Sequence, residues 1–368
     1  MADTEVVLLI GTRKGLFIAR SSGGRSQWQV DPPQLRMEET TAVGVDPRPT
    51  AGGAPPRLFA GSSSWVYGTR VLHSDDLGQS WAAVPDDAIR FPERTGAALA
   101  KVWQITPGIA DGEVWAGTEP SAVFRSTDGG MTFEMNDGLW DHPHRPDWAP
   151  GGGGQAVHTI LPHPSDAGDV LVAMSTGGVY RTTDGGSSWS PYSQGIRAEF
   201  MPEGQQYPEY GQCVHKVARH PEFPDELYAQ NHGGVFRSRD GGRSWDSIED
   251  GLPAVFGFPV LTDPRKPGRV FVFPLVADVD RFPPDGELAV WRSDDGGDHW
   301  ERRSVGLPAD AWTAVMRDAA CVDAGEPTGV YLGTRSGSVF GSADSGDSFS
   351  LVAQNLPDVL SLRAATIG

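Results

Sequence analysis

Cysteine is scarce in this 368-residue chain, which contains only Cys213 and Cys321. Two cysteines so far apart in the sequence make no disulfide framework, so nothing here requires an oxidising compartment. Long hydrophobic runs are lacking near the start, where Val6 to Ile10 forms a short apolar run after acidic residues. Such a run is shorter than a signal-peptide core or a membrane span. We therefore expect a cytoplasmic protein with no membrane partner.

Basic residues are few relative to acidic ones. Lys and Arg together number 30, Asp and Glu number 48, and the formal net charge is -18. A surface with this excess of negative charge repels phosphate backbones, so the composition excludes nucleic acid as a partner. We expect the acidity to serve solubility instead.

Glycine, proline and aromatic residues are what the chain has in quantity, with 47 Gly, 30 Pro, 12 Trp and 15 Phe. Gly and Pro in these amounts, without a collagen-like triplet, are typical of many short strands joined by tight turns. The aromatic residues supply material for a large core. The composition therefore predicts an all-β fold.

One eight-residue pattern recurs along the chain: Ser/Thr, any residue, Asp, any residue, Gly, any residue, Ser/Thr/His, aromatic. A degenerate copy that has lost the Asp ends at Trp28. Successive copies are about fifty residues apart, a period typical of propeller blades. The six complete copies are Ser74–Trp81, Ser126–Phe133, Thr182–Trp189, Ser238–Trp245, Ser293–Trp300 and Ser342–Phe349.

Apolar segments around each copy predict four antiparallel strands per repeat, and hence one domain, residues 1–368, with seven four-stranded blades. Phe256–Leu261 and Trp312–Met316 are predicted as innermost strands of two blades. The last strand has no partner after it, and the first strand has no innermost strand before it. We expect them to pair, so that blade 7 combines residues 5–30 with residues 358–367 and leaves no free edge.

The recurring octapeptide resembles the Asp-box, or bacterial neuraminidase repeat, and the resemblance covers the whole chain. It implies a β-propeller in which each Asp carboxylate accepts amide bonds within its own turn while the Gly takes a positive φ. It implies no single activity, since sialidases, xyloglucanases and binding proteins share the motif. The chain is most similar to bacterial cytosolic proteins named glycosyl hydrolases or exo-sialidases by similarity alone. The structural carboxylates are Asp76, Asp128, Asp184, Asp240, Asp295 and Asp344.

Three unusually long connections, within residues 134–155, 190–212 and 275–288, are expected on the face opposite the Asp-boxes. Long loops concentrated on one face of a scaffold are typical of a binding site. We expect a pocket for a small polar ligand at the mouth of the central channel. Its predicted lining residues are Trp103, Glu119, His158, Tyr207, Tyr210, His215, His232 and Arg281.

His158 and His215 occupy the same register in adjacent repeats, each three residues after a Gln, and His232 lies on a turn of the second repeat. Neutral imidazoles that converge in this way suit a divalent metal such as zinc, iron or copper. The alternative interpretation is that they bond loop carbonyls and hold the long connections in place. The sequence leaves both open.

Catalysis is a hypothesis that rests on carboxylates of the same face. A glycosidase needs two of them across the sugar, and the candidates are Glu119, Asp141, Glu199, Asp278 and Asp280. A sialidase is disfavoured. Sialidases that carry this repeat have six blades and usually an Arg-Ile-Pro tripeptide, whereas this chain is predicted to have seven blades and lacks the tripeptide. The sequence leaves three functional predictions. The first is a pocket that binds a small polar ligand or sugar, and in one version transforms it with metal assistance. The second is a glycosidase-like hydrolase, and the third is a non-catalytic scaffold that docks a protein.

Overall fold

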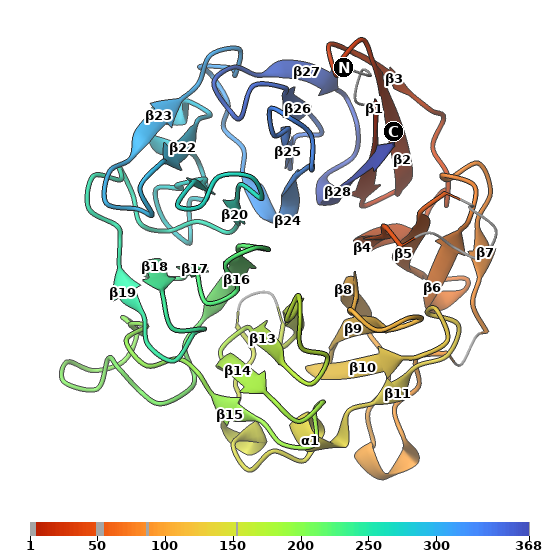
Figure 1. The fold of residues 1–368 in the computed structure, drawn as a ribbon, viewed down its shortest axis with the longest axis vertical. Helices are drawn as coiled ribbons and strands as arrows, with labels where there is room; N and C mark the ends of the chain where they lie inside the picture. The colour runs from red at the N-terminus through yellow and green to blue at the C-terminus, as the bar shows by residue number, and fades with distance from the viewer. Residues whose placement is uncertain (1–4, 49–54, 86–87, 152–153, 368) are drawn as a thin grey trace. The chain divides into compact units, whose positions relative to one another are not determined.

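The computed structural model describes residues 5–48, 55–85, 88–151 and 154–367 (Figure 1). It is nearly all β, as the composition predicts. The helical segments among the described residues are α1 (Asp137–Trp140) and three single turns at Glu93–Thr95, Arg145–Asp147 and Pro284–Gly286. None of the described helices is long and apolar enough to cross a lipid bilayer.

The residues group into two compact units. Unit 1 comprises Met1–Met37, Gly195–Arg197 and His215–Gly368, and unit 2 comprises Glu38–Gln194 and Ala198–Val214.

Unit 2 contains three four-stranded sheets in which every strand pairs antiparallel with its neighbour along the chain. The fourth strand of each sheet is only two residues long. The strands are β4 (Glu39–Asp46), β5 (Arg57–Ser64), β6 (Gly68–Ser74) and β7 (Ala82–Ala83); β8 (Lys101–Pro107), β9 (Val114–Glu119), β10 (Ala122–Ser126) and β11 (Glu134–Met135); and β12 (Val157–Pro162), β13 (Val170–Met174), β14 (Gly178–Thr182) and β15 (Ser190–Pro191).

Two further four-stranded sheets belong to unit 1, apart from Val214, the first residue of β16. Each runs through its strands in chain order. They are β16 (Val214–Arg219), β17 (Leu227–Asn231), β18 (Gly234–Ser238) and β19 (Asp246–Ser247); and β20 (Val260–Thr262), β21 (Val270–Val272), β22 (Val290–Ser293) and β23 (Glu301–Arg303).

The remaining strands of unit 1 form one eight-stranded sheet, in the order β27-β26-β25-β24-β28-β1-β2-β3. The first and last strands of the chain pair antiparallel within it, with Leu8 opposite Ala364, as the strand pattern at the two ends predicts. The strands are β1 (Glu5–Thr12), β2 (Gly15–Ser22), β3 (Gln27–Val30), β24 (Val315–Val322), β25 (Val330–Thr334), β26 (Val339–Ser342), β27 (Ser350–Ala353) and β28 (Val359–Ile367).

Two innermost strands differ from the sequence prediction. β20 keeps only three residues, because Phe256 forms an isolated bridge to Leu275 instead of continuing the strand. β24 starts at Val315 rather than at Trp312, because Ala311 and Thr313 make turn bonds, from Ala311 N to Gly286 O at 2.7 Å and from Thr313 N to Ala311 O at 2.9 Å. The late start of β24 leaves Trp312, Thr313 and Ala314 to line the pocket described below.

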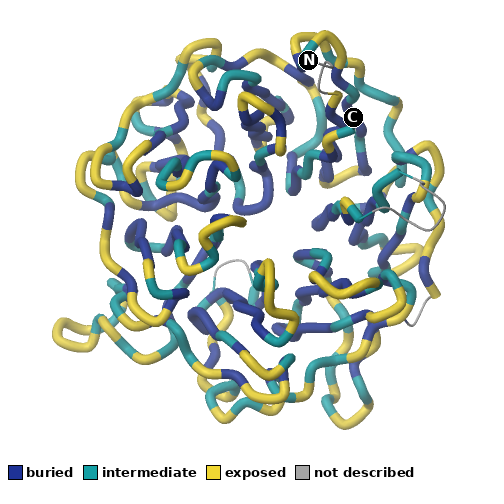
Figure 2. Tube along the Cα trace, in the orientation of Figure 1, coloured by how far each residue is buried: buried dark blue, intermediate teal, exposed yellow. Residues whose placement is uncertain are grey.

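The sheets are buried and the connecting loops are exposed (Figure 2). Large aromatic side chains fill the space between sheets, where burying apolar area supplies the main driving force for folding. The largest fully buried side chains include Trp115, Tyr180, Tyr228 and Tyr331.

The six complete repeats form one and the same hydrogen-bonded turn. In the copy around Asp184, Thr182 Oγ1 donates to Asp184 Oδ1 at 2.7 Å, Ser188 N donates to Oδ1 at 2.9 Å and Ser188 Oγ donates to Oδ2 at 2.6 Å. Donors that favour the charged carboxylate lower its pKa. They lower the pKa of Asp184 to about 2, and the bond from the Ser188 side chain contributes most. The other five carboxylates accept the equivalent bonds in their own turns: Asp76, Asp128, Asp240, Asp295 and Asp344. These carboxylates are structural.

Candidate functional site

A pocket of about 380 Å³ opens in unit 1, between the β21–β22 loop and the segments that precede β24 and follow β25. A volume of this size suits one small ligand. Its lining mixes apolar rings with hydrogen-bonding groups: Val279, Asp280, Arg281, Phe282, Trp312, Thr313, Ala314, Arg335 and Ser336.

Trp312 is the dominant side chain of this pocket. It is 62% exposed, yet its orientation is fixed, because its indole N–H donates to Asp310 Oδ1 at 2.8 Å. Phe282 meets the ring edge-on at a centroid distance of 5.7 Å. Gly286 lies so close that a Cβ there would stand 2.9 Å from the ring carbons. An exposed aromatic surface that is held in place is ready to stack on a ligand.

Arg281 projects into the same pocket from a strained backbone, with φ at 49°. A positive φ is rare for residues other than glycine and costs energy, so it often marks a functional position. Its Nε donates to Asp278 O at 2.9 Å, and its guanidinium lies 5.3 Å from the centre of the Phe258 ring. These contacts hold the guanidinium group in the lining of the pocket. Its terminal N–H groups make no side-chain hydrogen bond within the described part of the chain.

Arg335 forms the opposite side of the pocket. It donates to Asp358 Oδ2 from Nε at 3.2 Å and from Nη2 at 3.1 Å. Arg13 reaches the same oxygen at 3.5 Å. Ser336 N donates to Thr313 Oγ1 at 3.1 Å, which ties the loop after β25 to the segment before β24. The pocket wall is therefore preorganised.

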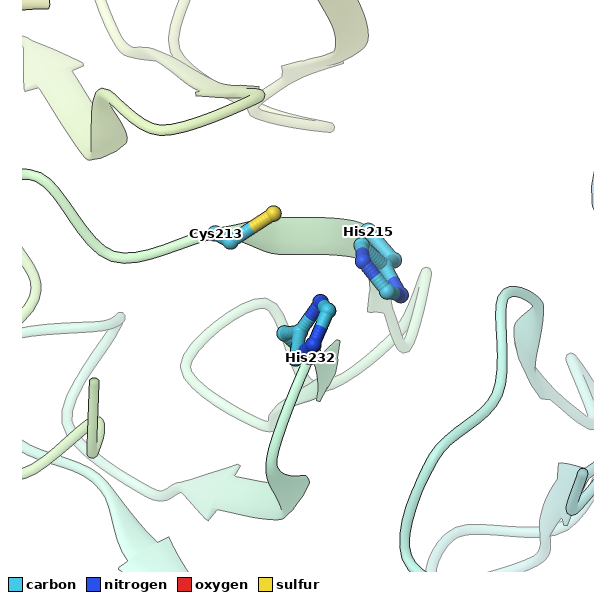
Figure 3. A group of neighbouring side chains, drawn as sticks. All are labelled: Cys213, His215 and His232. Carbon is cyan, nitrogen blue, oxygen red and sulfur yellow. The ribbon is translucent and has the colours of Figure 1, made fainter. Parts of the chain in front are cut away.

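Two of the predicted histidines, His215 on β16 and His232 just after β17, lie next to each other (Figure 3). Their ring centroids are 5.5 Å apart and the rings meet at 71°. Phe258 stacks on His215 at 4.8 Å, and Phe256 meets both imidazoles edge-on. The pair therefore occupies an aromatic environment within unit 1.

The protonation state of His215 follows from its surroundings. Burial lowers the pKa of its imidazole well below the usual value, and the nearby Arg317 lowers it further. Its Nδ1 lies 2.6 Å from Gly257 O, so Nδ1 carries the proton and Nε2 carries the lone pair. At neutral pH His215 is therefore an uncharged imidazole. The neighbouring His232 has its Nε2 3.6 Å from Asp278 Oδ2.

His158 makes the anchoring contacts that the alternative interpretation expects. Its Nε2 lies 2.9 Å from Val214 O, and its Nδ1 lies 3.2 Å from Thr159 Oγ1. Its role as a metal ligand stays a prediction.

The other predicted residues with described contacts lie in unit 2. Trp103 donates its indole N–H to Glu119 Oε2 at 3.0 Å. Tyr210 donates to Asp147 Oδ2 at 2.8 Å and stacks on His144 with ring centroids 3.7 Å apart. The Trp103 bond joins β8 to β9, whereas the contacts of Tyr210 join the two long loops of unit 2.

The remaining carboxylate candidates of unit 2 and Tyr207 differ in exposure. Asp141 pairs with Arg94 at 3.0 Å, an exposed ion pair of small energetic weight. Tyr207 is 66% exposed. Glu199 is half-buried, and its backbone carbonyl accepts from Gln206 Nε2 at 3.4 Å.

Sequence reasoning placed Asp280 and Arg281 at the functional face and missed Trp312 and Phe282 as pocket residues. Trp312 was assigned to a strand, where its side chain would have been part of the core. The signal that could have found it is the Pro308-Ala-Asp310 turn directly before it, since Pro and Asp favour turns over strands.

Four-stranded antiparallel sheets of this kind are the blades of β-propellers, and the solved structures that resemble this chain include β-propeller proteins. Two of these structures match most of this chain and most of their own length. A protein from Lactobacillus plantarum superposes with a TM-score of 0.60 at 12% identity, covering 98% of this chain and 99% of that one. YCF48 bound to D1 peptide superposes with a TM-score of 0.53 at 16% identity, covering 86% of each chain. At these identities the likeness concerns the fold.

Among characterised sequences, the chain is similar to the oligoxyloglucan-reducing end-specific xyloglucanase of Emericella nidulans. The two are 24% identical over 359 residues, which is 85% of this chain and 42% of the relative. This chain thus spans less than half of the length of that enzyme. No family model matches the sequence.

Proposed function

We propose that the pocket beside Trp312 binds a saccharide and that the protein is a glycoside hydrolase-like β-propeller. The observation that carries the proposal is the fixed, exposed indole of Trp312 next to a cavity with several hydrogen-bonding groups. A sugar ring has an apolar C–H face that stacks on an aromatic ring and a rim of hydroxyls that needs such groups. The similarity to a xyloglucanase supports the same ligand class.

We further propose that the protein hydrolyses the bound saccharide and that Asp280 is one of the carboxylates that carry out this reaction. Asp280 lines the pocket, and Asp278 lies two residues earlier in the same loop, beside His232. A glycosidase places one carboxyl group to protonate the leaving oxygen and a second to act as base or nucleophile. We propose Asp280 as the acid–base residue, with Asp278 as the second carboxylate.

Titration calorimetry with xyloglucan oligosaccharides tests the binding step. We expect Trp312→Ala to weaken binding at least about tenfold, since the stacking of a ligand ring on an aromatic side chain is worth on the order of 1–3 kcal/mol. Trp65→Ala is the matched control, because Trp65 is 88% exposed and does not line this pocket. Equal affinity in both variants, or no binding by the wild type to any neutral or charged oligosaccharide, would contradict the proposal.

Hydrolysis is measured separately by reducing-end release. Asp280→Asn should abolish turnover and leave binding within a fewfold of the wild type. If the wild type binds oligosaccharides and releases no reducing ends, the protein is a saccharide-binding propeller without activity.

We infer seven blades for the propeller. The eight-stranded sheet counts as two blades, because its halves meet in a single parallel bridge between Asp318 and Ser361. Five four-stranded sheets supply the others. A crystal or cryo-EM structure with another blade number would overturn this inference.

A second candidate function, docking of a protein, is favoured by the turn between β5 and β6. Trp65, Val66 and Tyr67 are 88%, 57% and 64% exposed there, and clustered exposed apolar residues commonly mark interaction sites. The fold neighbour YCF48 has been solved with D1 peptide bound. Loss of peptide binding in Trp65→Ala, with saccharide binding absent, would favour this alternative.

A further inference from the structure

His215 and His232 form a pair of imidazoles that the saccharide pocket does not include. His215 lies on β16, and His232 lies in the turn after β17 of the same sheet (Figure 3). Both are held among the rings of Phe256 and Phe258. Their positions are therefore set by packing rather than by a flexible loop.

We propose that His215 and His232, with Cys213 as a third ligand, form a binding site for a divalent transition-metal ion, and that zinc is the ion it fits best. Imidazole and thiolate are the donors that zinc prefers, and three protein ligands leave a fourth position open.

The spacing of the two rings suits one shared ion. A ring nitrogen of His215 lies within 4.8 Å of one of His232. Two imidazoles that bind zinc tetrahedrally at 2.0–2.1 Å have ring centroids about 5 Å apart, and these centroids are 5.5 Å apart.

The contact of His215 with Gly257 is the type that orients a metal-binding imidazole. Metal-ligating histidines commonly donate their second ring N–H to a carbonyl, which fixes the tautomer and the ring plane. His215 does this through Nδ1 at 2.6 Å and so presents Nε2 as the ligand atom. A structural histidine could make the same bond, so the neighbouring imidazole is needed for the inference.

The chain itself supplies the third ligand. Cys213 precedes His215 by two residues and is not part of a disulfide bond. Side chains at i and i+2 of an extended chain point to the same side. His232 adds a neighbouring carboxylate, Asp278, whose Oδ2 lies 3.6 Å from His232 Nε2.

The surrounding charges decide which ion the site accepts. Arg317 and Arg281 both interact with His215 and oppose a dication. Arg317 donates from Nε to His215 O at 3.1 Å, and both guanidinium groups lie over the Phe258 ring. A thiolate and a carboxylate offset this positive charge, whereas neutral ligands alone would not. Hard ions that need several oxygen ligands, such as calcium or magnesium, do not match this donor set.

The test uses the full-length protein, expressed without a histidine tag and freed of metal by chelation. Zinc binding is measured with a competing chromophoric chelator, and cobalt(II) serves as a spectroscopic substitute. We expect one equivalent of zinc, the visible absorption of tetrahedral cobalt(II), and a near-ultraviolet band from thiolate-to-cobalt charge transfer. Failure to bind an equivalent of zinc or cobalt, or binding of copper alone, would overturn the proposal.

Variants assign the ligands. His215 is buried, so His215→Ala risks misfolding; His232→Ala, at a side chain 30% exposed, is the principal variant. We expect His232→Ala to lower zinc affinity at least about tenfold, with the circular dichroism spectrum unchanged. His299→Ala is the matched control, because His299 is 86% exposed and bonds only to Asp295 in its own turn. Unchanged affinity in His232→Ala refutes the site.

Cys213→Ser decides the role of the thiolate. Loss of the charge-transfer band with weaker binding supports the three-ligand site. Full affinity and an unchanged spectrum would refute Cys213 as a ligand.

Discussion

Arg25 and Asp323 form a buried salt bridge in unit 1, with Arg25 Nη1 3.0 Å from Asp323 Oδ2 and the side chains 4% and 0% exposed. Arg25 belongs to the degenerate repeat that ends at Trp28 and lacks the usual Asp. Where the other repeats close a turn on their own carboxylate, this one reaches a carboxylate just after β24. Asp323 also accepts from Tyr331 Oη at 2.7 Å and from two backbone amides. The lost local interaction is thus replaced by a long-range one.

Removing Arg25 should therefore be costly. Arg25→Ala leaves the Asp323 carboxylate buried without its cation, and we expect the free energy of unfolding to fall by about 3–5 kcal/mol. Urea denaturation measures the change. Arg20→Ala is the control, since Arg20 pairs with Asp31 at a half-exposed site and should lose less than about 1 kcal/mol. Similar losses in the two variants would show that the buried bridge contributes no more than a surface pair.

A second buried network joins three strands of unit 1. Asp318 Oδ1 on β24 accepts from Lys216 Nζ of β16 at 2.7 Å and from Arg363 Nη2 of β28 at 2.9 Å. Asp318→Ala would leave two cations without their shared anion, so we expect a loss of about 3–5 kcal/mol in unfolding free energy. Thermal and urea unfolding check this. Lys216→Met should cost less, because Arg363 still neutralises Asp318. A Lys216→Met loss as large as that of Asp318→Ala would contradict this order.

The repeat turns should make stability depend on pH. Burial tends to raise the pKa of Asp128, but bonds from the Thr132 side chain and amide and from Ser126 lower it to about 2. A folded-state pKa below the unfolded value of 3.8 means that the stabilisation is present above about pH 4 and is lost as the pH falls towards 2.

Asp128→Asn tests this dependence. The variant should be less stable than the wild type by about 1 kcal/mol at pH 7, a value reduced for solvent screening of an exposed group. The difference should shrink as the pH is lowered from 4 to about 2. Urea unfolding at several pH values measures it. A difference that is constant with pH would mean that the carboxylate charge plays no part.

The sequence predicts the strands and repeat turns well because their cause is local and periodic. A Ser or Thr, an Asp and a Gly at fixed spacing close the same turn six times, whatever lies around them. The adjacency of His215 and His232 was predictable for a similar reason, since strand register sets which positions meet at one end of a sheet.

Trp312 and Arg25 were not predictable in this way. Trp312 is followed by a short apolar run that is typical of a strand, but the bond from Ala311 N to the distant Gly286 O helps to keep it outside β24. Arg25 has its partner almost three hundred residues away. No local pattern in one sequence records such long-range contacts.

Gly286 offers a test of the pocket in which none of the proposed ligand-contacting residues is itself replaced. Gly286 has φ at 71°, and a Cβ there would approach the Trp312 ring carbons to 2.9 Å. Gly286→Ala should therefore push the indole out of its present orientation. We expect saccharide affinity to fall severalfold and the tryptophan fluorescence to change, because an aromatic surface contributes most when it is held in the binding geometry.

The matched control for this variant is Gly251→Ala. Gly251 also has a positive φ, at 90°, but nothing lies within 4 Å of the Cβ that the substitution adds. Both variants carry the backbone strain of a left-handed alanine, so both should lose about 1 kcal/mol of stability. Only Gly286→Ala should lose affinity, because only there does the added methyl group meet Trp312. If the two variants bind oligosaccharides equally well, the orientation of Trp312 does not determine binding, and the pocket must hold its ligand through Arg281 and Arg335 instead.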